Sequence, residues 1–319
     1  MSAGTNSKVI NDMSTRLAHA VADDAVQQIV DLAHDFSIEA TLPPPADIEA
    51  LREFAPKGMP VFVSAVPSKP LMSGIEAAVQ VRNCGFEPVP HIVARNFPSR
   101  QSAEELITRM VGEAGVRRAL ILAGDLDNPA GDLFDAKALI ESGLLQKHGI
   151  KQIGISGYPE GHPRISQEKL LEALPGKLAA AKAAGLDVEI VTQFAFDAEA
   201  ITNWVKQVRQ GGHQERIRIG LAGPASFTAL LRYAKRCGVK ASTRGAARNT
   251  GLLKQMFGGM SAPDDIIRAL ALNGPKGYLG DIALHFFAFG GIPNTARWGT
   301  TVSQGRITLD SDDGFSLDV

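Results

Sequence analysis

The stretch VTQFAFD, from Val191 to Asp197, is a run of branched and aromatic residues that predicts a buried β-strand. The alanine-rich segment Gln167 to Ala184 precedes it and has the composition of a helix. Gln193 lies in the middle of the predicted strand, where a buried amide needs hydrogen-bond partners. The residues alone leave open whether Gln193 is a paired core residue or one that works in a site.

The same alternation of short β-rich segments and longer helical patterns extends in both directions from this stretch. Parallel strands joined by crossover helices account for this order, and eight strands make a (β/α)8 TIM barrel. The eight strand candidates are FSIEAT, MPVFVSAV, FEPVPHIVA, RALILAGD, QIGISGYP, VEIVTQFAF, IRIGLAGPA and ALHFFAFGG, which begin near Phe36, Met59, Phe86, Arg118, Gln152, Val188, Ile217 and Ala283. The clearest helices are Gly74 to Arg82, Ala103 to Val111, Gln167 to Ala184 and Ser226 to Lys235.

An open, doubly wound sheet is the alternative α/β architecture. Such a sheet binds a nucleotide at the turn after its first strand, but no GxGxxG follows that strand here. The segment GDLDNPAG, at the fourth candidate strand, matches neither of the common glycine-rich phosphate loops. The sequence therefore favours the barrel.

We expect a single α/β domain over residues 1–319, with an addition at each end of the barrel. Apolar residues at helical spacing predict N-terminal helices in 1–34, before a barrel over 35–299. The tail, 300–319, alternates around SDDG and predicts a small hairpin. The long segment before the last strand, 241–272, has space for two or three helices and is a candidate active-site loop.

The composition excludes several classes of partner. The net charge is −1, so neither nucleic acid nor an anionic membrane surface is expected to bind. No apolar stretch is long enough to span a bilayer, and the N-terminus lacks the core of a signal peptide. Cys84 and Cys237 suit a reducing compartment. We expect a cytoplasmic protein with small-molecule partners, and a homo-oligomer is compatible with the sequence.

Working residues of a TIM barrel lie at the carboxyl ends of its strands. Glu39 ends the first candidate strand and Asp125 the fourth, a pair suited to a general acid and an electrostatic partner. Glu39 also fits a solvated strand end, and Asp125 also fits a helix N-cap. The other polar residues at these ends are His91, Tyr158, His162 and Gln193.

The histidines among these residues do not predict a metal centre. His91, flanked by prolines and aliphatic residues, also fits a histidine of the core. His162 with Glu160 has no further partner at metal-ligand spacing, so we expect no metal.

Several of these motifs together resemble the methylenetetrahydrofolate reductases, which are flavin-dependent (β/α)8 barrels. The strongest element is GYPEGHP (Gly157 to Pro163), followed by an alanine-rich helix that ends in Gly185 and by VTQFAFD. SIEATLPPP, PHIVA and LAGD resemble the family's first, third and fourth strands in the right order. The resemblance runs from about Phe36 to Arg297.

The resemblance implies a role for each matching residue. Glu39 would be the general acid that opens the folate imidazolidine ring to an iminium ion, Asp125 would tune flavin and pterin, and Gln193 would bind the folate. NADH or NADPH would reduce FAD and leave, and the reduced flavin would then pass a hydride from N5 to the methylene carbon, supplying methyl groups for methionine. The implied FAD residues are His91, Gly124, Asp125, Ser156, Tyr158, His162 and Lys177, and Phe227 would pack on nicotinamide or folate.

The chain also departs from the family pattern. Ala123 replaces the family's arginine before Gly-Asp, and Leu42 is an extra residue before the proline pair. Alanines stand where the family has basic residues for the FAD phosphates, which leaves Lys177 and Lys182 nearby. The usual Thr-Tyr-Gly turn reads Val66-Pro67-Ser68, and Gly291 occupies an arginine position. We expect a divergent, short bacterial-type member without a C-terminal regulatory domain.

Two other functions stay open at this point. One is a related folate-dependent oxidase or demethylase-like flavoenzyme, which would run similar chemistry on another one-carbon adduct. The other is a folate-binding partner subunit without catalysis of its own, which the missing basic residues favour.

Overall fold

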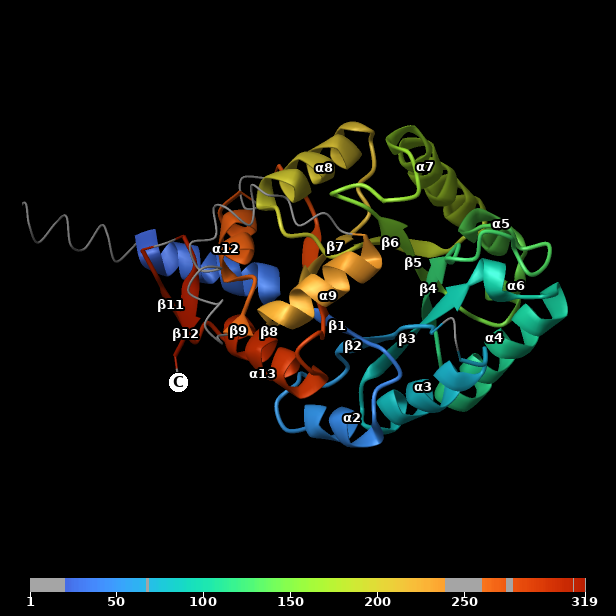
Figure 1. The fold of residues 1–319 in the computed structure, drawn as a ribbon, viewed down its shortest axis with the longest axis horizontal. Helices are drawn as coiled ribbons and strands as arrows, with labels where there is room; N and C mark the ends of the chain where they lie inside the picture. Colours follow the sequence, from blue (N-terminus) through green and yellow to red (C-terminus); the bar gives the residue numbers. More distant parts are fainter. Residues whose placement is uncertain (1–20, 67–68, 239–259, 274–277, 312, 319) are drawn as a thin grey trace, which may run out of the picture.

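The barrel predicted from the sequence is the centre of the fold. The computed structural model describes residues 21–66, 69–238, 260–273, 278–311 and 313–318. Eight parallel strands close into a barrel in the order β1, β10, β7, β6, β5, β4, β3, β2. Helices surround the strands (Figure 1). The (β/α)8 TIM barrel is therefore confirmed.

All eight strand candidates form barrel strands, and each begins within a residue or two of its predicted start. They are β1 (Ser37–Ala40), β2 (Pro60–Val63), β3 (Glu87–Val93), β4 (Arg118–Leu122), β5 (Gln152–Gly157), β6 (Asp187–Thr192), β7 (Ile217–Ala222) and β10 (Ile282–Phe287). Two short pairs lie outside the barrel: β8 (Ala225–Ser226) with β9 (Met260–Ser261), and β11 (Ile307–Leu309) with β12 (Phe315–Leu317).

The helices cover the outer surface of the barrel. The four predicted helices are confirmed, as α3 (Ser73–Asn83), α4 (Arg100–Ala114), α7 (Gln167–Ala183) and α9 (Phe227–Cys237). The others are α2 (Pro45–Leu51), α5 (Ala136–Glu141), α6 (Leu144–Lys147), α8 (Ala198–Gln210), α12 (Asp264–Asn273), α13 (Ile292–Ser303) and the 3-10 turn η1 (Ala94–Asn96).

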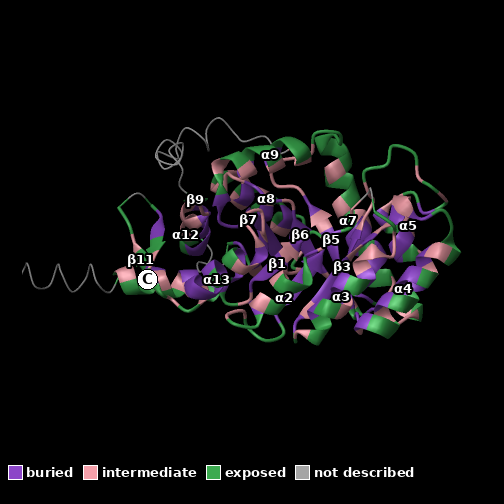
Figure 2. Cartoon of the chain, turned by 60° about the horizontal axis from the view of Figure 1, so that its bottom comes forward, coloured by how far each residue is buried: buried purple, intermediate pink, exposed green. Residues whose placement is uncertain are grey.

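Burial follows the two-layer arrangement of the fold. The strands are buried, and the helices expose their outer faces (Figure 2). A small apolar cluster of Phe62, Val89, Leu120 and Val191 stands apart from the main core. Gly154 leaves room for this cluster, because a Cβ there would lie 2.9 Å from Leu120 and 3.1 Å from Val191.

The two ends of the chain carry the predicted additions. Residues 21–33 form a helix before β1, whereas residues 1–20 of the predicted N-terminal helices lie outside the described residues. In the tail, β11 and β12 pair as an antiparallel hairpin. Most of the candidate active-site loop, and Pro67 and Ser68 of the second-strand turn, lie outside the described residues. No helix in the described part of the chain is long and apolar enough to cross a membrane.

Two positions, Gln193 and Asp125, differ from the sequence-based expectations, and the structure shows how the extra residue Leu42 is accommodated. Gln193 does not lie in the middle of a strand, because β6 ends at Thr192. Its backbone N–H still donates to Gly157 O at 2.9 Å, and the next N–H turns to the Gln193 side chain. The Ala195 N–H again donates to β7, at Gly220 O and 3.1 Å. Asp125 lies three residues beyond β4 rather than at its end. The extra residue Leu42 has a φ of 42°, so the insertion is absorbed in a strained turn after β1.

Candidate active site

A cavity of about 1460 Å³ lies at the carboxyl end of the barrel and extends along α7 and α8. It exceeds the ~300–1,000 Å³ of most small-molecule sites. Phe227 does not line it. The other predicted site residues all do: Glu39, His91, Gly124, Asp125, Ser156, Tyr158, His162, Lys177 and Gln193.

Glu39, on β1, lies inside the barrel with 13% of its side chain exposed. Ser64 follows β2, and its Oγ donates to Glu39 Oε1 at 2.8 Å. His285, on β10, places Nε2 at 3.4 Å from Glu39 Oε2. His91, on β3, places its Nε2 at 3.3 Å from the same oxygen. Neighbouring strands of the barrel wall thus converge on one carboxylate.

The histidines decide the charge of this carboxylate. Burial by itself would raise the pKa of Glu39, but the charge of His91 and the hydrogen bond from His285 together outweigh burial. The pKa of Glu39 therefore lies well below its usual range. In the ligand-free protein Glu39 is an anion at neutral pH, so it can act as an acid only after it takes up a proton.

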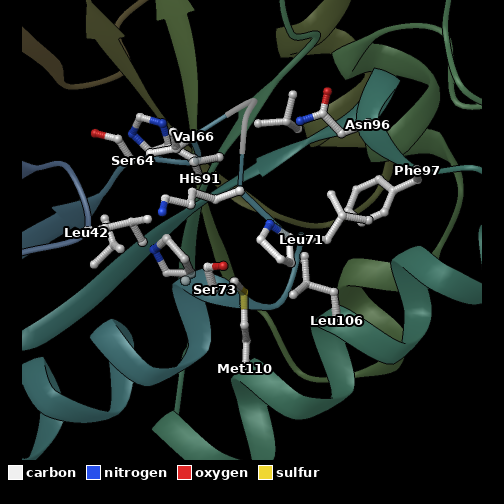
Figure 3. Close-up of a pocket in the computed structure, with 17 residues that line it drawn as sticks. Leu42, Ser64, Val66, Leu71, Ser73, His91, Asn96, Phe97, Leu106 and Met110 are labelled. Atoms are coloured by element: carbon white, nitrogen blue, oxygen red, sulfur yellow. The ribbon is translucent and has the colours of Figure 1, made fainter.

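His91 is the unsatisfied member of this group. Its Nε2 is buried and has no hydrogen-bond partner among the described residues, so its approach to Glu39 has ion-pair distance without hydrogen-bond geometry. His91 also lines a second cavity of about 30 Å³, which has room for about one water. Figure 3 shows Ser64 and His91 on one side of this cavity and Leu106 and Met110 of α4 on the other. A buried nitrogen that faces a carboxylate without a well-formed hydrogen bond is costly, which favours a working role over a structural one.

Asp125 has a different environment. Its side chain is 76% exposed, and Oδ1 accepts a hydrogen bond of 2.8 Å from Arg164 Nη2. Arg164 also lies 3.5 Å from Asp127. Gly124, the preceding residue, has a φ of 100°, and a Cβ there would lie 2.5 Å from Val93. Only glycine therefore places Asp125 at this point of the rim without strain.

Tyr158 and His162 lie together on the loop after β5. Their rings meet edge to face with centroids 5.1 Å apart. Burial raises the pKa of the Tyr158 hydroxyl. Burial and the charge of Arg164 lower the pKa of His162. Both rings are therefore neutral at pH 7, and both residues line the cavity.

Gln193 presents its amide to the cavity directly after β6. Its Oε1 accepts the Phe194 N–H at 3.0 Å, which fixes the orientation of the side chain. In the described part of the protein the amide nitrogen makes no hydrogen bond. The contrast between the bound oxygen and the unbound nitrogen points to a donor kept for a ligand.

The phosphates of FAD would need cationic side chains along the cavity. Lys177 is 8% exposed, donates to Ser156 O at 2.9 Å, and burial lowers its pKa to about 8. Alanines of α7 stand where the family has basic residues, and two alanines of this helix, Ala180 and Ala181, are buried in the core. The cavity is nevertheless lined by other cations: Arg95, Lys137, Arg164 and Lys169. A pyrophosphate beside α5 and α7 would meet these cations, although Arg95, Lys137 and Arg164 already pair with Phe134 O, Glu141 and Asp125.

The sequence did not single out several residues that the structure brings to the cavity. Ser64 and His285 hold Glu39, and Phe287 and Trp204 line the walls. A polar residue within the apolar strand LHFF was the available signal for His285, of the kind that marked Gln193. Phe227 begins α9 and is half-buried.

Comparison with solved structures identifies similar folds. An uncharacterized protein from Clostridium thermocellum that binds two copies of 5-methyl-5,6,7,8-tetrahydrofolic acid has a TM-score of 0.50 and 11% identity, over 87% of this chain and 96% of that one. A dihydropteroate synthase from Thermus thermophilus has a TM-score of 0.45 and 15% identity, over 84% and 92% of the two chains. At 11% identity, the first likeness shows the fold alone.

Sequence comparison identifies the family. Methylenetetrahydrofolate reductase 2 of Saccharomyces cerevisiae is 31% identical over 162 residues, which cover 47% of this chain and 26% of the yeast protein. The aligned part is thus about a quarter of that relative's length. The family profile described as methylenetetrahydrofolate reductase matches residues 46–244, which is more than half of the chain. The resemblance read from the motifs is confirmed, and the protein belongs to the methylenetetrahydrofolate reductase family.

Proposed function

We propose that the protein reduces methylenetetrahydrofolate to methyltetrahydrofolate with NADH or NADPH as the hydride donor and FAD as the carrier. The family supports folate chemistry, and the observation that carries the proposal is the Glu39 group beneath the cavity. A single carboxylate, enclosed by Ser64, His91 and His285, is the kind of group that moves a proton in a sheltered site. FAD, when bound, supplies the hydride transfer.

The residues of this chain would act on the folate as follows. Glu39 takes up a proton, for which His91 Nε2 is the adjacent nitrogen, and donates it to the imidazolidine ring as the ring opens. The carboxylate that remains is stabilised by Ser64 and His285, and it faces the positive charge of the iminium ion. A low pKa suits this second task, because the anion must persist while the cation exists.

The other cavity residues would bind and orient. The free amide hydrogens of Gln193 donate to the folate, and Tyr158 and His162 offer neutral aromatic faces to the flavin. Arg95, Lys137, Arg164 and Lys169 meet the phosphates, with Asp125 at the rim beside Arg164. Lys177 and Ser156 hold each other and shape the wall between α7 and β5.

The test is reconstitution with FAD. Purified protein supplied with FAD should gain a flavin absorption spectrum and oxidise NADH or NADPH when methylenetetrahydrofolate is present, forming methyltetrahydrofolate. Protein that binds FAD but turns over neither nicotinamide nor folate contradicts the proposal.

A folate-binding subunit without its own catalysis is the second candidate. The buried Ala180 and Ala181, and the engagement of Lys177 by Ser156, favour weak binding of FAD. Protein that stays colourless at saturating FAD but binds folate tightly would support this candidate over the reductase.

A further inference from the structure

His285 is held on both ring nitrogens at the centre of the barrel. It is 0% exposed on β10, and its ring packs against Phe62 and Phe287 with centroids 4.6 and 5.1 Å away. Nδ1 lies 2.9 Å from Ser37 Oγ, and Nε2 lies 3.4 Å from Glu39 Oε2. A histidine fixed in this way has one orientation, in contrast to His91, whose Nε2 has no partner among the described residues.

Ser37 decides which nitrogen of His285 carries the hydrogen. The guanidinium of Arg218 can only donate, and its Nη1 lies 3.4 Å from Ser37 Oγ, so Oγ accepts there. The hydroxyl hydrogen then has two acceptors within reach, His285 Nδ1 at 2.9 Å and Leu284 O at 3.4 Å. The shorter contact assigns it to Nδ1. Nδ1 is then an acceptor, and the ring hydrogen is on Nε2, facing Glu39.

The charges around the ring keep it neutral. Burial is the largest influence on the pKa of His285 and lowers it, and the positive charges of Arg218 and His91 act in the same direction. Glu39, through its hydrogen bond and its charge, opposes this shift without reversing it. Among the described residues, these three are the charged groups that act on the ring, from β7, β3 and β1. A neutral ring with hydrogen on Nε2 donates to the carboxylate without titrating beside it.

We propose that His285 is a positioning residue for Glu39, with its tautomer set by Ser37 and Arg218 behind it. This inference rests on the proposed function, in which Glu39 is the acid of the folate reaction. Ser64 then fixes one carboxylate oxygen and His285 the other, so the carboxyl group has a single orientation under the cavity. His91 is left as the neighbour free to exchange the proton.

The first test removes the donor and keeps the shape. His285→Phe fits an aromatic surrounding, and Ser37 retains Leu284 O and Arg218 as partners, so the barrel should fold. Folate reduction should fall by about tenfold to a hundredfold in kcat, the loss expected for one hydrogen bond to a charged group. KM and nicotinamide oxidation with an artificial acceptor should be unchanged. In the pH profile of kcat, the ionisation that belongs to Glu39 should move to higher pH, because the carboxylate anion has lost a hydrogen-bond donor.

Two further variants separate positioning from packing. His285→Gln returns an amide donor and should recover part of the rate. Ser37→Ala leaves the ring but frees its tautomer, so a smaller loss of about threefold to tenfold is expected. His148→Phe is the matched control, because His148 Nε2 also pairs with a glutamate, Glu104 at 2.9 Å, on the outer surface. It should leave the kinetics and the pH profile unchanged.

An NMR measurement tests the inference apart from the activity. In protein labelled with 15N-histidine, the His285 signal is the one that the His285→Phe variant lacks. From pH 6 to 8 this signal should be that of a neutral ring with its hydrogen on Nε2. Ser37→Ala should change the signal. Wild-type protein with this signal but no folate reductase activity defeats the proposed function and leaves the positioning intact. A ring with hydrogen on Nδ1, or a fully active His285→Phe enzyme, overturns the inference.

Discussion

Both ends of the barrel interior contain buried polar groups, but the two ends differ in how those groups are paired. At the amino end of the strands, Glu189 (β6) is 1% exposed and lies between Arg118 (β4) and Arg218 (β7). Arg118 also reaches Glu87 at 3.7 Å, and Arg218 reaches Asp35 at 3.3 Å. Each buried charge there has an opposite charge beside it. We call this set the basal ion network.

At the carboxyl end the polar group is incomplete. Glu39 has donors on both oxygens, but His91 Nε2 has no hydrogen-bond partner among the described residues, and a large cavity lies above. Burial of charge therefore does not by itself indicate function. In a closed network every charge already has its partner, whereas an open group next to a cavity is a candidate for catalysis.

The largest effect is expected from breaking the basal ion network. Glu189→Leu leaves Arg118 and Arg218 buried without their shared carboxylate, and it should lower the free energy of unfolding by about 3–5 kcal/mol. Urea unfolding measures this loss. Glu113→Gln removes an exposed Arg–Glu pair on α4 and should leave the midpoint unchanged. Equal stability of the Glu189 variant and the wild type would show that the two barrel ends do not differ as described.

Glu39→Gln is the corresponding change at the mouth. Folate reduction should fall by about a hundredfold or more, the usual loss for a general acid. Nicotinamide oxidation with an artificial acceptor should change little, whereas the unfolding midpoint should fall, because a carboxylate whose pKa is lowered on folding stabilises the folded protein at neutral pH. Single-turnover measurement of the two half reactions separates these outcomes, and Glu104→Gln, which removes the glutamate of a surface His–Glu pair, serves as the control. Equal loss in both half reactions contradicts the assignment of Glu39 to folate.

Gln193 offers a smaller test of the open end. Gln193→Leu should raise KM for the folate by about threefold to tenfold, because one neutral hydrogen bond is lost. Gln193→Glu keeps an oxygen for the Phe194 N–H but removes the amide donor, so it isolates the donor from the backbone contact. Steady-state kinetics and FAD titration of both variants are the measurements. Normal folate kinetics in a folded Gln193→Leu protein would show that Gln193 is a core residue and not a folate ligand.

The smallest effect comes from a carboxylate outside both groups. Burial raises the pKa of Asp264, at the start of α12, from 3.8 to about 6. Ionising it costs the folded state stability as the pH rises from about 4 through 6, so Asp264→Asn should stabilise the protein above pH 6 and not below pH 4. After screening by solvent, a gain of about 1 kcal/mol is expected. Thermal unfolding at pH 4 and pH 7.5 checks the sign, and a gain at both values would contradict it.

Much of the fold was predictable because its signal is local. Eight short apolar segments alternate with helical patterns, and each strand candidate became a barrel strand. The positions of Gln193 and Asp125 were less accurate, because strand ends depend on pairing with neighbours. Gln193 lies beyond β6 since the following N–H bonds to its side chain rather than to the ladder.

Much of the candidate site was also predictable, since the ends of parallel strands meet at one mouth. Glu39, His91 and Gln193 all line the cavity, as the barrel requires. Their assigned roles remain proposals. The FAD contacts were harder to predict, because Lys177 is within reach of the cavity but its ammonium is taken by Ser156.

The amino-acid order alone predicted the barrel, the family and the polar residues at the strand ends. It could do so because periodicity and motifs are properties of short stretches of sequence. Which of these residues act on one another depends on how the chain folds. Ser37 and His285 are 248 positions apart, and Arg218 reaches Ser37 across 181 positions. Closure of the barrel places β1 beside β10, so the orientation and charge of Glu39 depend on contacts that no local pattern encodes.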